Sequence, residues 1–206
     1  MKLTHSQKKT LEEAVKTYNQ SLSLAEDYLS KRGLTVQDGN RFLLGVVNDP
    51  LPGHEVYKGR LVIPYLTRTG VIDIRFRSID GNDPKYLGLP GATTHLFNVT
   101  SLFKAQDWIA VCEGEIDTIT LDLKVGFPTI GVPGANNWKK HYYKLLADFE
   151  KIVIFADGDQ AGQDFARQLA KELGTVTIIS MPDGEDVNSI YTKHGLDFFK
   201  EKMKVE

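Results

Sequence analysis

The sequence contains a single cysteine, Cys112, among its 206 residues. One thiol excludes an internal disulfide and any zinc site built from several thiolates. No run of residues approaches the roughly 18 uncharged apolar residues that a membrane-spanning helix needs, and the first residues contain no apolar signal core. These absences predict a cytoplasmic protein with neither zinc nor a membrane among its partners.

Glycine, proline and charge are not in excess, with 18 Gly, 8 Pro and 25% charged residues. This composition excludes collagen, a coiled coil and a largely disordered chain. Because 41% of the residues are hydrophobic, the chain can form one compact domain or two small ones with a real core.

The net charge is only −2, but its distribution is uneven. Residues 1–105 carry 14 Lys and Arg against 10 Asp and Glu, whereas residues 106–206 carry 11 against 17. A net charge of +4 on one half and −6 on the other predicts two tasks, binding a polyanion and binding cations. We therefore divide the chain into an N-terminal part, 1–105, and a C-terminal part, 106–206.

The N-terminal part reads as helices followed by a β-rich region. Apolar residues recur at three- and four-residue steps over the first thirty residues, which predicts amphipathic helices. Residues 60–66 and 71–77 read as two strands joined by a turn. Alternation in the second strand predicts one face made by Ile72, Ile74 and Phe76. The opposite, more polar face is expected to carry Val71, Asp73, Arg75 and Arg77.

The C-terminal part alternates strands and helices. Apolar runs without polar alternation predict strands that are buried on both faces. These strands are expected at 108–112, 128–132, 151–156 and 176–180. Helices are expected between them at 115–126, 138–149 and 160–173. This order predicts an α/β fold with a four-stranded parallel sheet flanked by helices, preceded by a smaller basic α+β subdomain.

Acidic residues follow three of these strands where each strand ends. The segments are E-G-E-I-D at 113–117, D-G-D-Q-A-G at 157–162 and P-D-G-E-D at 182–186. Because the carboxyl ends of parallel strands meet at one edge of a sheet, these carboxylates should crowd into one crevice. Their repulsion is costly unless cations are bound, and oxygen-only ligands favour Mg²⁺ or Mn²⁺. The pattern predicts a divalent-metal site for a phosphate-bearing substrate.

Several of these residues also have a simpler structural interpretation. Asp159 could cap the helix that begins at residue 160, Asp183 could form a turn, and Glu115 suits the first turn of a helix. Glu113 is harder to explain without a ligand, since it ends an apolar strand where burial would be costly. Cys112 is expected to be a small buried strand residue, because no histidine stands near it in the sequence.

The three acidic motifs, in this order on a βα frame, resemble the TOPRIM domain shared by bacterial-type DNA primases, topoisomerases and some nucleases. In the N-terminal part, Y-K-G-R-L-V-I-P-Y at 57–65, I-R-F-R at 74–77 and P-K-Y-L at 84–87 are similar to the basic subdomain of bacterial and phage primase catalytic cores. S-L-A-E-D-Y-L-S-K-R-G-L at 23–34 resembles the helix that opens such cores.

The resemblance implies a DNA primase catalytic core in a bacterial cell or a phage-infected host. Such a nucleotidyltransferase synthesises short RNA primers on single-stranded DNA from ribonucleoside triphosphates. It implies two Mg²⁺ or Mn²⁺ ions held by Glu113, Asp157, Asp159 and Asp186, with Asp117 and Asp183 in support. Glu113, Asp157 and Asp159 would be catalytic, Glu113 as general base or as ligand. The residues implied to face the template or the incoming triphosphate are Lys58, Arg60, Arg75, Arg77, Lys85 and Tyr86.

Two departures from the family pattern affect this interpretation. The family often has an aspartate where this chain has Asn188, so that one metal ligand would be neutral or absent. The zinc-binding and helicase-binding domains usual in such primases are not recognised, so a separate zinc-finger or initiation protein, or a replicative helicase, would be a further partner. Two other functions stay open, a metal-dependent TOPRIM nuclease and a non-enzymatic accessory subunit that binds single-stranded DNA.

Overall fold

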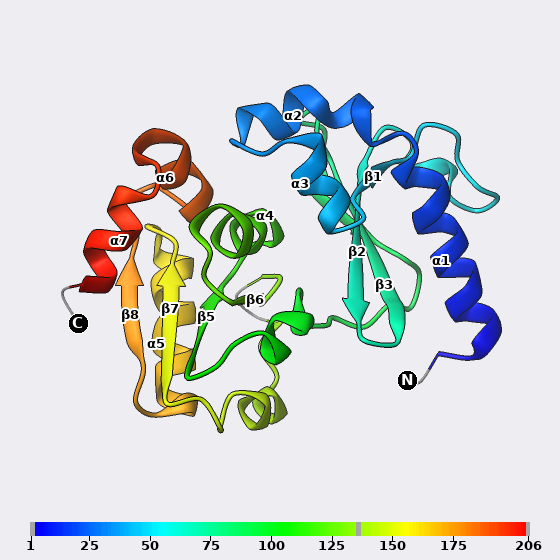
Figure 1. Ribbon diagram of the computed structural model, residues 1–206. Coiled ribbons are helices and arrows are strands. Elements are labelled where there is room, and N and C mark those ends of the chain that lie inside the picture. The colour runs from blue at the N-terminus through cyan, green and yellow to red at the C-terminus, as the bar shows by residue number, and fades with distance from the viewer. Residues whose placement is uncertain (1–2, 135–136, 205–206) are drawn as a thin grey trace. The chain divides into compact units, whose positions relative to one another are not determined.

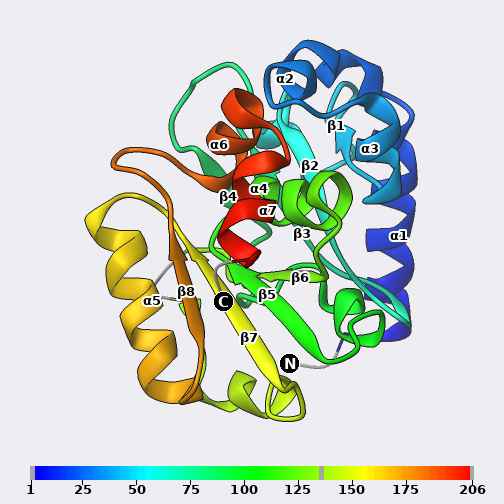
Figure 2. The same cartoon turned by 60° about the vertical axis from the view of Figure 1, so that its left-hand side comes forward.

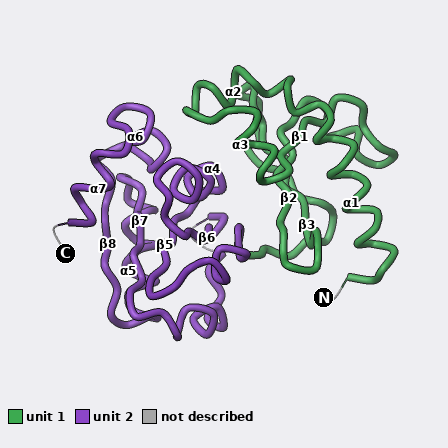
Figure 3. Tube along the Cα trace, in the orientation of Figure 1, with its two compact units in different colours: residues 1–95 green, residues 96–206 purple. Residues whose placement is uncertain are grey.

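The computed structural model describes residues 3–134 and 137–204. Two compact units, Met1–His95 and Leu96–Glu206, divide the chain (Figure 3). Residues 96–105, which the charge-based division groups with the N-terminal part, belong to the second unit. Phe97 joins this segment to the second unit, because it exchanges backbone hydrogen bonds of 2.8 and 3.0 Å with Gly131.

The first unit begins with short helices, as predicted for the first thirty residues. They are α1 (His5–Asn19), the 3₁₀ helix η1 (Leu22–Ala25), α2 (Glu26–Lys31) and α3 (Val36–Arg41). Capping boxes open α1 and α3, where Thr4 pairs with Gln7 and Thr35 pairs with Asp38. Each box provides partners for backbone N–H groups that a helix start leaves unpaired. Gly33, at φ 66°, follows α2 and allows the chain to turn there.

A four-stranded antiparallel sheet in the order β1-β2-β3-β4 completes the first unit. Figure 1 labels the first three of these strands. Its strands are β1 (Gly45–Val46), β2 (Leu61–Thr67), β3 (Gly70–Arg77) and β4 (Tyr86–Gly88), and the 3₁₀ helix η2 (Glu55–Tyr57) precedes β2. β2 and β3 confirm the two predicted strands. Val15 and Tyr18 of α1 share a buried cluster with Val62, Ile74 and Phe76 of these strands. The amphipathic face of α1 is therefore buried on the sheet.

A β-bulge in β3 changes the predicted faces of this strand. Tyr65 of β2 pairs with Asp73, but the next pair skips Ile72. As a result, Val71 joins Ile74 in the cluster beneath α1. The prediction that Val71 shares a face with Asp73 and the two arginines is wrong, because alternation does not continue across a bulge.

The second unit is built on a four-stranded parallel sheet in the order β6-β5-β7-β8, as predicted. Its strands are β5 (Trp108–Cys112), β6 (Thr129–Gly131), β7 (Lys151–Ala156) and β8 (Thr177–Ser180). Successive side chains of a strand pack on opposite faces of the sheet, in two different buried clusters. Val111 and Ile154 pack in one buried cluster, whereas Cys112 and Phe155 pack in another. Burial on both faces accounts for the uninterrupted apolar runs in the sequence.

Helices cover both faces of this sheet (Figure 2). They are α4 (Glu115–Ile119), which continues as the π-helix η4 (Thr120–Val125), then α5 (Gln160–Leu173), α6 (Val187–His194) and α7 (Asp197–Lys204). Phe165 and Leu169 of α5 pack on one face, and Ile190 and Phe199 of α6 and α7 pack on the other. Gly126, at φ 83°, ends the predicted helix 115–126.

The helix expected at 138–149 is replaced by a short 3₁₀ helix, η6 (Lys140–Leu145), and a second one, η3 (Val99–Phe103), precedes β5. Trp138, Tyr142 and Leu146 are buried, and their four-residue spacing suggested a longer helix. The same three side chains reach the core from irregular chain, so the apolar spacing did not require an α-helix.

Among the described residues, no helix combines the length and the apolar character needed to cross a bilayer.

Candidate metal and nucleic-acid sites

The acidic loops follow the carboxyl ends of β5, β7 and β8, and hydrogen bonds tie the last two loops together. Gly158 N–H donates to the carbonyl of Glu185 at 2.8 Å, and Gly184 N–H donates to the carbonyl of Gly158 at 3.0 Å. A Cβ at Gly158 would overlap the carbonyl oxygen of Pro182. Position 158 therefore requires glycine for the two loops to approach.

Asp159 and Asp186 cap the helices that follow them. Asp159 Oδ1 accepts a hydrogen bond from Gly162 N–H at 2.7 Å at the start of α5. Asp186 Oδ1 accepts one from Ser189 N–H at 2.6 Å, and the Ser189 hydroxyl completes a capping box at the start of α6. The capping interpretation of Asp159 is thus confirmed. Each cap also fixes a carboxylate at the end of the sheet where the other acids lie.

Asn188 and Asp117 connect α6 to α4. Asn188 N–H donates to Asp117 Oδ1 at 2.9 Å, and the Asn188 side-chain amide donates to the Thr120 hydroxyl at 2.9 Å. Asn188 is 1% exposed and Asp117 is 8% exposed. The amide at position 188 is therefore used for packing α6 against the helix that carries Asp117.

Asp157 lies at the centre of the acidic group. Burial raises the pKa of its carboxyl to about 8, and the negative charges of Asp117, Glu113, Asp186 and Asp159 add to this effect. Its Oδ1 is buried and accepts no hydrogen bond from the part of the chain that the structure describes. Four other acids thus act electrostatically on the Asp157 carboxyl, and a bound cation would relieve this repulsion.

These residues fit a hard divalent ion by chemistry. A buried carboxylate oxygen without a donor, surrounded by further carboxylates, is the kind of ligand that Mg²⁺ prefers. Within residues 3–134 and 137–204, however, no three His, Cys, Asp or Glu side chains are arranged so that they alone could hold an ion. Since Mg²⁺ usually keeps several waters and binds through one or two carboxylates together with substrate phosphates, this arrangement suits a site completed by a phosphate.

Glu115, Asp183 and Cys112 lie in or beside the acidic motifs, and local structure accounts for each of them. Glu115 is 2% exposed in the first turn of α4, and Asp183 is an exposed turn residue. Cys112 is fully buried beside the Thr118 hydroxyl at 3.2 Å. Burial, followed by the negative charge of Asp117, raises the pKa of the Cys112 thiol well above its usual value. Its expected role as a small buried strand residue is confirmed.

In the first unit, the arginines of β3 gather around Tyr86 of β4. The guanidinium carbon of Arg75 lies 4.5 Å from the centroid of the Tyr86 ring, and Arg77 donates a hydrogen bond to the Tyr86 hydroxyl. Arg77 is only 6% exposed, so it does not lie on a solvated face. Arg77 also lies 5.7 Å from the ring centroid of Tyr28 in α2, which is not among the predicted site residues. No local sequence pattern connects Tyr28 to β3.

The other predicted nucleic-acid residues lie around the same strand and loop. Arg60 Nη1 donates to the carbonyl of Pro84 at 2.8 Å, which joins the start of β2 to the segment before β4. Lys58 and Lys85 are exposed. The structure therefore divides the predicted set into positioned arginines and solvent-facing lysines.

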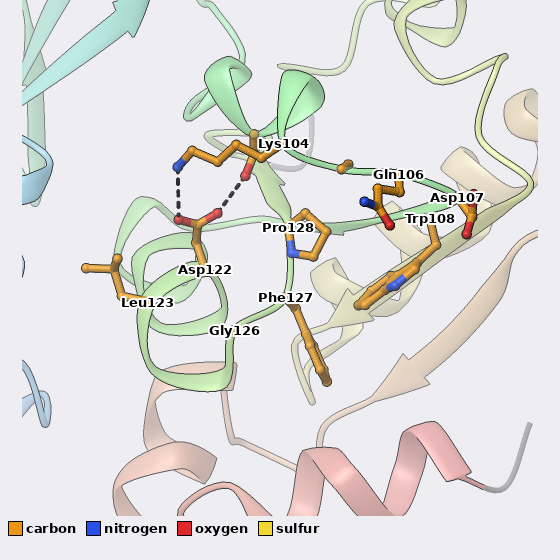
Figure 4. Close-up of a pocket in the computed structure, with 11 residues that line it drawn as sticks. Lys104, Gln106, Asp107, Trp108, Asp122, Leu123, Gly126, Phe127 and Pro128 are labelled. Atoms are coloured by element: carbon orange, nitrogen blue, oxygen red, sulfur yellow. Dashed lines mark hydrogen bonds and ion pairs between the residues drawn. The ribbon is translucent and has the colours of Figure 1, made fainter.

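A pocket of about 470 Å³ opens in the second unit, beside the start of β5 and the segment that leads into β6 (Figure 4). Trp108, Phe127 and Pro128 line its apolar side. Asp122 of the π-helix lines the polar side, where it accepts a hydrogen bond from Ser101 at 2.6 Å and lies 3.9 Å from the Lys104 ammonium group. The pocket contains none of the predicted site residues, because it lies at the amino ends of the strands.

A parallel sheet with acidic loops at the carboxyl ends of three strands defines this unit as a Toprim domain, and the family model described as Toprim-like matches residues 110–191. More particularly, the chain belongs to the same family as the gene 57 protein of Mycobacterium phage D29. The two are 42% identical over 153 residues, which cover 72% of this chain and 100% of that protein.

Bacterial DNA primases are more distant relatives. The DNA primase of Salmonella typhimurium is 26% identical over 242 residues, which cover 91% of this chain and 41% of that primase. The chain thus spans about two fifths of that primase. Among solved structures, the DnaG primase catalytic domain bound to single-stranded DNA matches with a TM-score of 0.74 and 21% identity, over 94% of this chain and 78% of that one. This likeness concerns the fold, which combines the Toprim sheet with the N-terminal antiparallel sheet.

Proposed function

We propose that this chain is a primase-type nucleotidyltransferase that joins ribonucleoside triphosphates into short RNA on a single-stranded DNA template. One observation carries the proposal, the buried Asp157 carboxyl, whose pKa is raised to about 8 by burial and then by the negative charges of four other acids. Kinship with DNA primases, and the single-stranded DNA bound to the matching primase domain, support the choice of substrate.

The acidic residues would hold Mg²⁺ or Mn²⁺ in the Toprim unit. Asp157 offers its buried Oδ1, and Glu113, Asp159 and Asp186 surround it. When bound, such ions would neutralise charge on the triphosphate and lower the pKa of the attacking hydroxyl. Glu113, directly after β5, would bind an ion or accept the proton of that hydroxyl. The caps at Asp159 and Asp186 would keep both carboxylates in place during this reaction.

In the first unit, Arg75 and the exposed Lys58 and Lys85 would contact phosphates of the template or of the incoming nucleotide. A planar guanidinium suits bidentate phosphate binding, whereas lysine acts as a point charge. Such contacts set register without reading base sequence. Binding should weaken steeply as salt concentration rises, because phosphate contacts release counterions.

The direct test is incubation of the protein with single-stranded DNA, labelled ribonucleotides and Mg²⁺. We expect short labelled RNA from the wild type and none from Asp157→Asn/Asp159→Asn. The matched control Asp148→Asn removes an exposed acid before β7 and should keep full synthesis. Loss of template without new RNA would instead identify a nuclease. Full synthesis by the double variant would show that these acids do not catalyse the reaction.

A further inference from the structure

The 3₁₀ helix η6 of the second unit carries basic side chains and one tyrosine on its outer surface. A 3₁₀ helix has three residues per turn, so side chains three positions apart lie above one another in three columns. The column of Tyr142 faces the core, where this residue is 8% exposed. The other two columns hold Lys140 with Tyr143, and His141 with Lys144. These four residues, which we call the η6 patch, are all exposed, and no acid lies among them.

Buried side chains beside the η6 patch fix its position on the fold. The rings of Trp138 and Tyr142 meet edge to face, with centroids 5.7 Å apart, and Trp138 Nε1 donates to Glu172 of α5 at 2.9 Å. The ring centroid of His141 lies 4.6 Å from that of Tyr142, and the Lys139 ammonium group lies 5.8 Å from the same ring. Tyr142 therefore anchors η6 in the core, and the outward side chains extend from a fixed backbone.

The η6 patch is basic, whereas the chain around it is acidic. Residues 106–206 carry 17 acids against 11 Lys and Arg, and three of those 11 stand at positions 139, 140 and 144. Lys140 and Lys144 form no ion pair with any acid in the described part of the chain. Exposed cations of this kind, beside an exposed aromatic ring, are typical of surfaces that bind single-stranded nucleic acid.

We propose that the η6 patch is a second binding surface for single-stranded nucleic acid, with Lys140 and Lys144 on phosphates and Tyr143 stacked on a base. Lysine acts as a point charge, and a ring can stack on any base, so the surface would bind a strand without reading its sequence. A lipid surface matches less well, because Leu145 is the only exposed aliphatic residue of η6.

The η6 patch is separate from the candidate metal site. It precedes the amino end of β7, whereas the loop that begins at Asp157 follows the carboxyl end of this strand (Figure 1). The proposal concerns binding alone, so it does not require that the acids catalyse a reaction. A strand held at η6 would be an additional contact, beyond those proposed for the first unit.

The salt dependence of binding tests the two lysines. Binding of a long labelled single-stranded oligonucleotide to the full chain would be measured by anisotropy over a series of salt concentrations. We expect Lys140→Gln/Lys144→Gln to bind more weakly and to reduce the slope of log K against log salt by about 1.4, since each phosphate contact on a single strand contributes about 0.7. Lys200→Gln/Lys204→Gln removes the same charge from α7, on the other face of the sheet, and should leave both quantities unchanged.

Tyr143 is tested by removal or retention of its ring. Tyr143→Ala should lower affinity roughly 5-fold or more with the salt slope kept, because it removes a stacking contact but no charge. Tyr143→Phe keeps the ring and should bind more tightly than Tyr143→Ala. Since Tyr143 is 41% exposed, we expect both variants to fold, and their melting temperatures would be compared with that of the wild type.

The source of the strand is identified by repeating the series with DNA and with RNA of the same sequence. A deficit of the double lysine variant with either strand supports the proposal, and the strand affected identifies the ligand. An unchanged salt slope with both strands would overturn the proposal, and so would a folded Tyr143→Ala that binds as tightly as the wild type. Loss of binding to phosphatidylserine vesicles, with oligonucleotide binding kept, would also overturn it and identify a lipid contact.

Failure of this proposal differs from failure of the proposed function. If the η6 patch does not bind nucleic acid, its variants keep wild-type affinity and salt slope whether or not the chain synthesises RNA. If the proposed function is wrong, the wild type itself makes no RNA, and the affinities of the η6 variants still report on the patch.

Discussion

Asn188 donates its backbone N–H to Asp117 Oδ1 at 2.9 Å, although the two residues are 71 positions apart in the sequence. The same asparagine uses its side-chain amide to reach the Thr120 hydroxyl. Both contacts are buried, and they join the start of α6 to the helix that follows β5. The asparagine that departs from the acidic motif thus has a structural role within the Toprim unit.

Replacement of Asn188 tests this role. Asn188→Ala removes the donor to Thr120 and should lower the free energy of unfolding by about 1–3 kcal/mol, as expected when a buried hydrogen bond is lost. Asn188→Asp should destabilise at neutral pH as well, because it places a second carboxylate beside Asp117. Urea denaturation measures the free energy of unfolding of both variants. Thr192→Ala, which changes an exposed residue of the same helix, is the control. If Asn188→Asp instead strengthens Mg²⁺ binding without loss of stability, position 188 faces the metal site.

Asp157→Asn should stabilise the metal-free protein. The pKa of Asp157 is about 8 in the folded state, against about 3.9 for an aspartate in an unfolded chain. The folded state therefore disfavours the carboxylate, and wild-type stability should fall as pH rises from about 4 to 8. An asparagine at this position cannot ionise, so the variant does not lose stability in this way as pH rises. In EDTA, the melting temperature of the variant should therefore exceed that of the wild type at pH 8, and the two temperatures should be similar near pH 4. Added Mg²⁺ should raise the melting temperature of the wild type only.

A similar argument applies to Asp73 in the first unit. Burial raises the pKa of its carboxyl to about 6, although the Ile74 N–H and the charge of Arg75 favour the ionised form. The folded pKa lies above the unfolded value, so ionisation of Asp73 destabilises the folded state. This loss of stability should develop between about pH 4 and 6. We expect Asp73→Asn to melt at a higher temperature than the wild type at pH 7, and at a similar temperature near pH 4. Asp27→Asn, which removes an exposed carboxyl of the same unit, is the matched control. An equal gain in melting temperature there would contradict the assignment to Asp73.

Gly158→Ala should disturb the two acidic loops directly. The added Cβ would overlap the carbonyl oxygen of Pro182, and relief of that overlap would break the contacts between the loops after β7 and β8. We expect a loss of about 1–3 kcal/mol in stability and a larger loss of RNA synthesis, since the acids move apart. Gly184→Ala provides the control, because nothing lies within 4 Å of its Cβ and only its φ of 75° is strained. Equal activity of both variants would show that the loop contact does not position the acids.

Much of the second unit could be predicted from its sequence. Apolar runs such as 151–156 have no polar alternation, and only burial on both faces of a sheet explains this pattern. Since parallel strands end at a common edge, the acids after β5, β7 and β8 had to be neighbours. The helical spacing of Trp138, Tyr142 and Leu146 was ambiguous, because irregular chain can bring the same side chains into the core.

The sequence by itself determined the sheet of the Toprim unit and the acids at its edge, since periodicity and chain order specify both. Only the tertiary structure decided that Val71 turns inward at a bulge, that Arg77 is buried between two tyrosine rings, and that Asn188 contacts Thr120. Each of these outcomes depends on which side chain of a distant segment fills the adjacent space. Such contacts depend on packing between segments that are far apart in the sequence, so no local sequence pattern predicts them.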